Sequence, residues 1–248
     1  MFKIDISIFK ALAQNRREIL LTLYLNSNTN LKTPLHFISA HALVESAKSK
    51  DLMEIFLNGS LACDSFPLTK YLGFFFANNQ QVRGTDFMRE FIKNAPRGSR
   101  HYFLGGSPET LMGIEIYVKS LEREDLICQY ESPPYTSNWR DYSDEWLEKI
   151  RNFKAEYVWI GMGSPKQFYI SDFIWKNLDI ATFSVGAAFD FIGGTKKECP
   201  KVVQSIGFEW LFRLLSEPSR LWKRYTVDNL HFILLLINNL IKIKRLVN

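Results

Sequence analysis

Several stretches of this 248-residue chain place polar residues or glycines directly after a short apolar run. They are Asp64 after SLAC, the Gly105-Gly106 pair after HYFL, Gln167 in the GSPKQ loop and Asp190 in GAAFDF. Apolar runs that end in this way are typical of buried parallel strands, whose carboxyl ends form the binding sites of α/β proteins. Together these groups could bind a nucleotide and hold one general base.

Two of these features also have structural interpretations. The carboxylate of Asp64 suits a general base, but aspartate after a strand is equally common as the N-cap of the next helix. Glycines between a strand and a helix, as at Gly105 and Gly106, often serve only to relieve steric crowding. The residue pattern leaves both alternatives open.

Several enzyme classes lack their characteristic motifs here. Lys166 occupies the place of the third glycine of a dinucleotide fingerprint, and the sequence contains no P-loop or GxSxG elbow. No HExxH motif, Cys/His cluster or DxD pair offers metal ligands, so we expect neither a metal nor another cofactor. An inverting sugar transfer remains compatible, because it needs a carboxylate to accept a proton and amides or cations to stabilise a diphosphate leaving group.

Strand patterns alternate with helix patterns along the chain, which predicts a Rossmann-like α/β fold with a mostly parallel sheet flanked by helices. We expect one helix over residues 7–25 and a helix that ends at Gly59. Another helix should begin near Thr85 and Asp86, which are good N-caps.

The composition favours a folded protein of a reducing compartment. Hydrophobic residues make up 46% of the chain, enough for a full core. Cys63, Cys128 and Cys199 are odd in number and widely spaced, which does not suit a disulfide framework. The first twenty residues lack the pattern of a secretory signal, so we expect a cytoplasmic protein.

Positive charge is concentrated near the C-terminus. The net charge is +5, and residues 213–248 alone carry +5, with seven Lys or Arg against Glu217 and Asp228. We therefore expect an α/β core over residues 1–195 and a basic amphipathic helical appendage over residues 196–248. A neutral body with a basic, apolar tail favours an anionic membrane surface over nucleic acid as a partner.

The tail pattern predicts how this appendage meets a membrane. Pro218 should begin a helix on which Arg220 and Arg224 share a face. The later apolar run covers only residues 232–237, which is too short to span a bilayer and favours a helix lying on its surface. A helix packed on the core or in a homo-oligomer interface would show the same pattern, and both alternatives stay open.

Three segments, GMGSPKQF, VGAAFDFIGGTKKECPK and GFEWLFRLLSEPSRLWKRY, resemble the WecG/TagA/CpsF family, glycosyltransferase family 26. HALV, CDS, VRGTDF, FLGGSP and YESPPY extend the resemblance over nearly the whole chain. It implies a bacterial enzyme of cell-surface polysaccharide synthesis at the inner face of the cytoplasmic membrane. Such an enzyme transfers a sugar from a UDP donor to a polyprenyl-diphosphate-linked sugar, with inversion and without a metal. The donor would carry an N-acetylhexosamine or hexuronic acid, such as ManNAc or ManNAcA, or else glucose or GlcA.

The resemblance assigns roles to residues of this sequence. It implies that Asp64 is the catalytic base and that the nucleotide-sugar site includes Gly105, Gly106, Gln167 and Asp190. It also implies a sugar or acceptor pocket at Ser39 and His41, and contacts to the acceptor diphosphate at the membrane from Arg213, Arg220 and Arg224.

Three departures from the family pattern bear on activity. Phe37-Ile38-Ser39 stands where the family has Thr-Pro-Asn, Ser65 replaces the glycine after Asp64, and Phe168 replaces a glutamate. These changes point to an altered sugar specificity. They also motivate an alternative function, that of a non-catalytic relative that binds a nucleotide sugar and acts as a partner in polysaccharide assembly.

Overall fold

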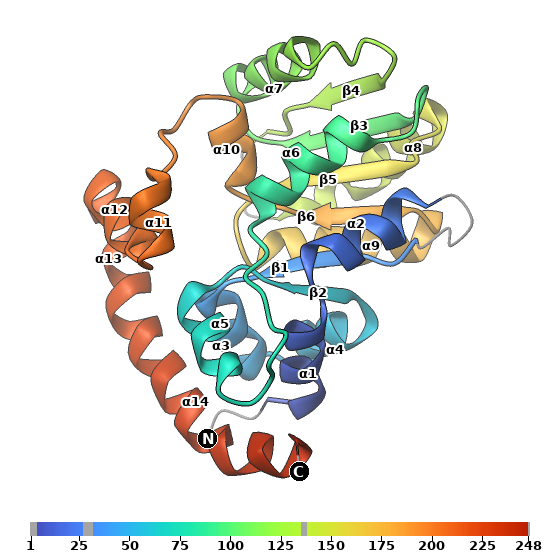
Figure 1. Cartoon of the computed structure of the whole chain (residues 1–248). Helices are drawn as coiled ribbons and strands as arrows, with labels where there is room; N and C mark the ends of the chain where they lie inside the picture. Colours follow the sequence, from blue (N-terminus) through green and yellow to red (C-terminus); the bar gives the residue numbers. More distant parts are fainter. Residues whose placement is uncertain (1–3, 27–31, 135–137, 248) are drawn as a thin grey trace.

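The computed structural model describes residues 4–26, 32–134 and 138–247, apart from the side chains of residues 220, 223–225 and 245–247. In this part of the chain six strands form one parallel sheet, in the order β2-β1-β6-β5-β3-β4 (Figure 1). The expected α/β fold is therefore confirmed. The strands are β1 (Leu35–Ile38), β2 (Ser60–Cys63), β3 (Arg100–Gly105), β4 (Ile127–Glu131), β5 (Tyr157–Gly161) and β6 (Ala181–Ser184).

Helices cover both faces of the sheet, because alternate strand residues point to opposite sides and are apolar on both. Phe103 and Trp159 pack on one face, and Leu104 and Ile160 pack on the other. The first face carries α2 (Arg17–Leu25), α6 (Gly84–Asn94), α7 (Pro108–Ser120) and α10 (Ala188–Ile192). The second carries α1 (Ile6–Gln14), α3 (Ala40–Lys48), α4 (Lys50–Asn58), α5 (Phe66–Gly73), the 3-10 helix η1 (Trp139–Tyr142), α8 (Ser143–Phe153) and α9 (Lys166–Leu178).

The prediction of one helix over residues 7–25 is wrong. α1 ends at Gln14, and the side-chain amide of its C-cap residue Asn15 donates a hydrogen bond to the carbonyl oxygen of Leu61 at 2.7 Å. α1 contributes to the hydrophobic cluster on one face of the sheet and α2 to the cluster on the other face. The chain must pass from one face to the other between them, and a continuous helix could not do so.

Two other helix boundaries were predicted with different success. Gly59 ends α4, as expected. α6 begins at Gly84, one to two positions before the start expected near Thr85 and Asp86. Its N-cap residue is Arg83. Arg83 makes no capping hydrogen bond through its side chain, which is instead engaged in ion pairs near the strand ends.

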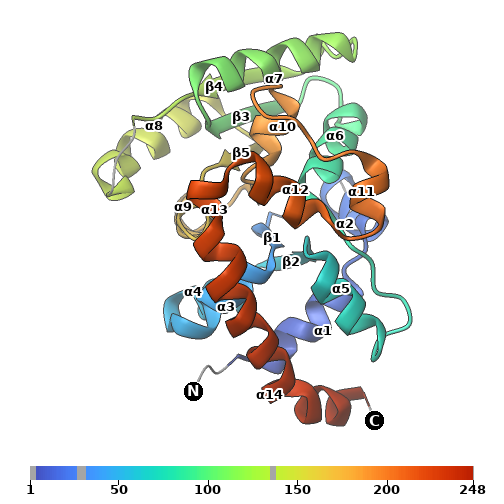
Figure 2. The same cartoon turned by 90° about the vertical axis from the view of Figure 1, so that its left-hand side faces the viewer.

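The C-terminal helices form an arm along the body of the protein (Figure 1), and Figure 2 shows this arm passing in front of α3. We use the term appendage for residues 196–248, as predicted, and Pro218 begins a helix within it as expected. The division into two domains at residue 195 stays a prediction. The helices of the appendage are α11 (Lys201–Ser205), α12 (Glu209–Ser216), α13 (Pro218–Lys223), the π-helix η2 (Arg224–Asp228) and α14 (Asn229–Val247).

α14 has apolar side chains on two sides. Phe232, Leu235 and Ile243 are buried in the same cluster as Ile8 and Phe9 of α1, so this side of the helix packs on the body. A second set is exposed, namely Leu230, Ile233, Leu234, Ile237, Leu240 and Ile241. We call this second set the exposed face of α14.

By length and composition alone, the segment Thr226–Lys244 is apolar enough to cross a membrane, with a mean hydropathy of 1.2. The six-residue run over 232–237 did not indicate this, because the apolar residues of α14 continue beyond Asn238 and Asn239. About a quarter of the segment is buried inside the protein (28%).

Candidate active site

Two cavities meet at the edge of the sheet where the strands end. The first, cavity 1, has a volume of about 190 Å³ and is lined by the segments that follow β1, β2, β5 and β6. Asp64, Gln167 and Asp190, three of the residues predicted for the site, all line it. The parallel sheet has therefore brought together polar groups that are far apart in the sequence.

The second, cavity 2, has a volume of about 350 Å³ and lies between α3, α5 and the appendage. Much of its wall is apolar and includes Phe66, Trp210 and Phe232. Ile233 also lines it and belongs to the exposed face of α14, so the cavity adjoins that face. Four residues line both cavities, namely Ser39, Asp64, Glu209 and Arg213.

Asp64 is held at the end of β2 by its backbone. Its amide donates to the carbonyl oxygen of Ile38 at 3.1 Å, and its own carbonyl oxygen accepts from the side chain of Gln81 at 3.0 Å. The N-cap of α5 is Ser65, whose hydroxyl accepts from the amide of Leu68. The interpretation of Asp64 as a helix cap is therefore wrong, and its carboxylate is left to face the cavities.

The surroundings of Asp64 favour a base that works near neutral pH. Burial raises the pKa of the carboxyl group to about 7, and the negative charge of Glu209 adds to this effect. The positive charges of Arg83 and Arg213 and a hydrogen bond from the amide of Gly84 oppose it. A general base is most effective when its pKa lies close to the working pH.

Arg83 is the centre of an ion-pair network that the sequence pattern did not predict. Its guanidinium lies 2.9 Å from Glu198 and 3.2 Å from Glu209, and it also pairs with Asp86 at 3.3 Å. Glu198 in turn pairs with Arg89 at 2.8 Å. Burial lowers the pKa of Arg83, but the surrounding carboxylates outweigh it and raise the pKa above its usual value. Arg83 stays charged and joins α6 to the appendage.

Gln167 presents an unsatisfied acceptor at cavity 1. The side-chain amide is buried and donates to the carbonyl oxygen of Ser184 at 3.1 Å, whereas Oε1 has no hydrogen-bond partner among the described residues. The Oγ of Ser164, also in the wall of cavity 1, is likewise buried without a partner in that part of the chain. A buried polar atom without a hydrogen bond reduces the stability of the fold by about 1–3 kcal/mol. Both atoms would therefore gain from a polar ligand that binds them.

Gly105 and Gly106, which were also predicted for the nucleotide site, do not line cavity 1. The amide of Gly106 donates to the carbonyl oxygen of Gly161 at 3.2 Å, and its carbonyl oxygen accepts from Ser132 at 2.7 Å. A Cβ on Gly105 would lie 2.6 Å from the carbonyl oxygen of Gly161. The pair allows β3 and β5 to approach closely, and its role in nucleotide binding stays a prediction.

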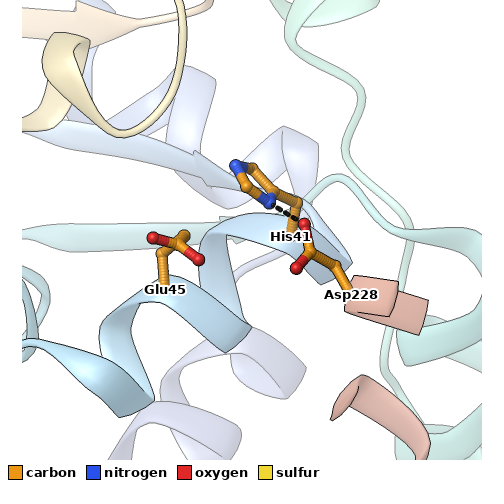
Figure 3. A group of neighbouring side chains, drawn as sticks. All are labelled: His41, Glu45 and Asp228. Atoms are coloured by element: carbon orange, nitrogen blue, oxygen red, sulfur yellow. Dashed lines mark hydrogen bonds and ion pairs between the residues drawn. The ribbon is translucent and has the colours of Figure 1, made fainter. Parts of the chain in front are cut away.

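Ser39 and His41 lie at the start of α3 and line cavity 2. The hydroxyl of Ser39 caps α3 by accepting from the amide of Ala42 at 3.2 Å. The Nδ1 atom of His41 lies 2.7 Å from a carboxylate oxygen of Asp228 (Figure 3). This contact joins α3 of the body to the appendage.

His41, Glu45 and Asp228 place ligand-type atoms within 4.8 Å of one another (Figure 3). The ammonium group of Lys48 lies 2.7 Å from Glu45 and 3.7 Å from Asp228, however. Because this ammonium already pairs with both carboxylates, the group fits an ion-paired clamp between α3 and η2 better than it fits a metal site.

A comparison with protein families decides the class of the protein. The model of the glycosyl transferase WecG/TagA/CpsF family matches residues 12–246. The chain belongs to this family. It is therefore a glycosyltransferase of the WecG/TagA/CpsF type, in cell-surface polysaccharide synthesis, and the family suggests a nucleotide-sugar donor and a lipid-linked acceptor.

The structure shows what surrounds the three residues that depart from the expected family pattern. Phe37 is buried, contacts Phe87 at 5.3 Å between ring centroids and forms part of the wall of cavity 1. Phe168 is fully buried and packs edge-on against Phe56 at 5.0 Å. Both rings put apolar surface where the family resemblance led us to expect a hydroxyl or carboxylate group. Ser65, the third departure, caps α5.

Of the three arginines predicted to meet the acceptor, Arg213 lines both cavities and lies over the ring of Phe191 at 5.6 Å. The side chains of Arg220 and Arg224 lie outside the described part of the structure, so their shared face is not tested. Glu209 was also missed, although a single carboxylate within the apolar stretch GFEWLF was a usable signal.

Proposed function

We propose that this glycosyltransferase moves a sugar from a UDP-sugar to a polyprenyl-diphosphate-linked sugar, with inversion and without a metal. The observation that carries the proposal is the pair of adjacent cavities with Asp64 in both walls. Cavity 1 is rich in polar groups and suits a nucleotide sugar. Cavity 2 is more apolar and adjoins the exposed face of α14, so it suits an acceptor whose lipid stays in a membrane.

The reaction follows from this placement. The Asp64 carboxylate accepts the proton of the acceptor hydroxyl as its oxygen attacks the anomeric carbon. The bond from that carbon to the diphosphate oxygen breaks on the opposite face, and UDP leaves with the bonding electron pair. Attack from the face opposite the leaving group inverts the anomeric configuration.

The positive charge needed by the diphosphates comes from side chains at the cavities. Arg213 borders both cavities, and Lys196 pairs with Asp190 of cavity 1 at 2.8 Å. Guanidinium groups bind phosphate oxygens through paired hydrogen bonds, and this supports a metal-independent transfer.

The exposed face of α14 supports a peripheral position on the inner face of the cytoplasmic membrane. Lys242 and Lys244 are exposed on the same helix and would meet anionic headgroups. One side of α14 packs on the body, so the helix lies along the protein, and we infer that it rests on the bilayer and does not cross it.

A screen of UDP-sugars tests the proposal. Purified protein in anionic vesicles that contain a polyprenyl-diphosphate-linked sugar should release UDP and form a product of inverted configuration from at least one donor. EDTA should leave this rate unchanged within about twofold, since the developing charge is met by side chains. Binding of a UDP-sugar without transfer from any donor or acceptor would favour the non-catalytic alternative, which the aromatic side chains of Phe37 and Phe168 motivate.

A further inference from the structure

Glu209 is an acidic residue of the appendage that reaches the body beside Asp64. It is the first residue of α12, and its neighbours Phe208 and Trp210 are both partly exposed apolar residues. Its carboxylate lines cavity 1 and cavity 2, as does that of Asp64. The carboxylates of Asp64 and Glu209 repel each other when both are charged. Some other interaction must therefore stabilise Glu209 beside Asp64.

The contacts of Arg83 supply that interaction. Oε2 of Glu209 lies 3.2 Å from Nε of Arg83, and Oε1 lies 3.5 Å from its Nη2. Nη1 is bonded to Glu198 at 2.9 Å and to Asp86 at 3.3 Å. Arg83 is buried, so its guanidinium cannot turn into solvent. Both edges of the guanidinium are thus held by carboxylates other than that of Asp64.

Without Glu209, the Nε and Nη2 edge of Arg83 would lack its carboxylate partner next to Asp64. A buried guanidinium forms strong bidentate hydrogen bonds with a neighbouring carboxylate. Asp64 lines the same cavity as Arg83, and its carboxylate already interacts electrostatically with this guanidinium. A carboxylate bound in this way is a weaker base and is turned away from an incoming hydroxyl group.

Building on the proposed function, we propose that Glu209 is a positioning residue for the catalytic base. By occupying Arg83 it keeps the carboxylate of Asp64 free to accept the proton of the acceptor. Because Glu209 belongs to the appendage, Asp64 is competent only while α12 is docked at the strand ends.

The electrostatic effect of losing Glu209 would also make Asp64 a weaker base. The pKa of Asp64 is raised mainly by burial and next by Glu209, whereas Arg83 lowers it. Loss of the Glu209 charge removes one of the raising effects and frees the guanidinium that lowers the pKa. Both changes make Asp64 more acidic.

The test measures the pKa of Asp64 directly in the full-length protein. Aspartate carboxyl carbons labelled with ¹³C are titrated by NMR, and the Asp64 signal is identified by its loss in Asp64→Asn. Glu209→Gln should lower the pKa of Asp64 by roughly one unit or more. Glu209→Asp, which keeps the charge, should restore it in part. Asp86→Asn is the matched control, because Asp86 also pairs with Arg83 but does not line either cavity, and it should cause little or no shift.

The pH profile of sugar transfer is the second measurement, and the low-pH limb of Glu209→Gln should move with the Asp64 signal. An unchanged Asp64 pKa in Glu209→Gln, in a protein that transfers sugar, would overturn the role of Glu209 and leave the proposed function standing. A shifted Asp64 pKa in Glu209→Gln, combined with a wild-type protein that transfers no sugar from any donor, would support the role of Glu209 and overturn the proposed function. Circular dichroism checks folding, and Glu209→Ala provides a second neutral variant if the glutamine disturbs packing.

Discussion

Asp64 follows a strand in the first third of the chain and Glu209 begins a helix of the appendage, yet both side chains line the same two cavities. The strand end supplies the base and the appendage supplies part of its surroundings. Substitutions at either residue should therefore change catalysis, the response to pH and stability in ways that can be separated.

Replacing the proposed base should abolish most of the activity and spare donor binding. Asp64→Asn keeps the shape of the side chain but cannot accept the proton, so the transfer rate should fall by about 10²- to 10⁴-fold. UDP binding, followed by calorimetry, should change little. Asp51→Asn, an exposed aspartate in the first turn of α4, is the control and should keep the wild-type rate. An Asp64→Asn variant with full activity would disprove the assignment.

The transfer rate should depend on the protonation of Asp64. Its pKa is raised to about 7, chiefly by burial, and only the ionised form can act as a base. The rate should therefore be nearly constant above pH 8 and should fall by about tenfold per pH unit well below 7. Steady-state rates between pH 5 and 9 at saturating donor check this. A rate that stays constant down to pH 5 would contradict it.

The same carboxylate should reduce the stability of the fold at alkaline pH. The folded state raises the pKa from 3.8 to about 7, so it binds the proton more tightly than the unfolded chain does. This contribution to stability is complete below about pH 4 and is lost as the pH rises through 7, by at most about 4 kcal/mol. Asp64→Asn should therefore have a higher free energy of unfolding than the wild type at pH 8. Urea titrations should show this difference disappearing near pH 4.

The exposed face of α14 should determine membrane binding. Ile237→Ser combined with Ile241→Ser removes two side chains that are 61% and 67% exposed and should weaken binding to anionic vesicles by roughly 10- to 100-fold. Met112→Ser with Ile116→Ser on α7 is a matched control, since these side chains are 60% and 62% exposed on another surface. Equal loss of vesicle sedimentation in both double variants would argue against a specific role for α14.

The contact between His41 and Asp228 should hold the appendage to the body. Both side chains are largely buried, and Asp228→Asn removes the carboxylate that contacts Nδ1 of His41 while keeping the size of the side chain. The cost should be about 1–3 kcal/mol, seen as faster hydrogen exchange in η2 and α14. Asp179→Asn breaks an exposed pair with Lys32 and should have little effect. If α14 exchanges at the wild-type rate in Asp228→Asn, the clamp contributes nothing to docking.

The sequence predicted the parts of this molecule that depend on local pattern. The alternation of strands and helices gave the fold class, and the apolar run before Asp64 placed a carboxylate at a strand end. The break between α1 and α2 was missed because it depends on which face of the sheet each helix covers, and that is a tertiary property. No periodicity distinguishes the two faces when both are apolar.

Within the site, the contact between Arg83 and Glu209 also could not be predicted from local sequence pattern. Each was visible as a charged residue in a motif, but their ion pair joins segments that only the folded chain brings together. The pattern at Gly105 and Gly106 fitted both phosphate binding and close packing. Their contacts with Gly161 show the packing role, and the role in nucleotide binding stays a prediction.

The packing of α14 against α1 also affects how the protein is made. Ile8 and Phe9 are synthesised long before Leu235 and Ile243, yet all four belong to one cluster. A ribosome-bound chain therefore leaves the part of α1 that packs on α14 uncovered until α14 has emerged, and contacts so distant in sequence form slowly. Because Glu209 and Arg213 lie in the same late segment, a nascent chain that already holds Asp64 does not yet have a complete active site.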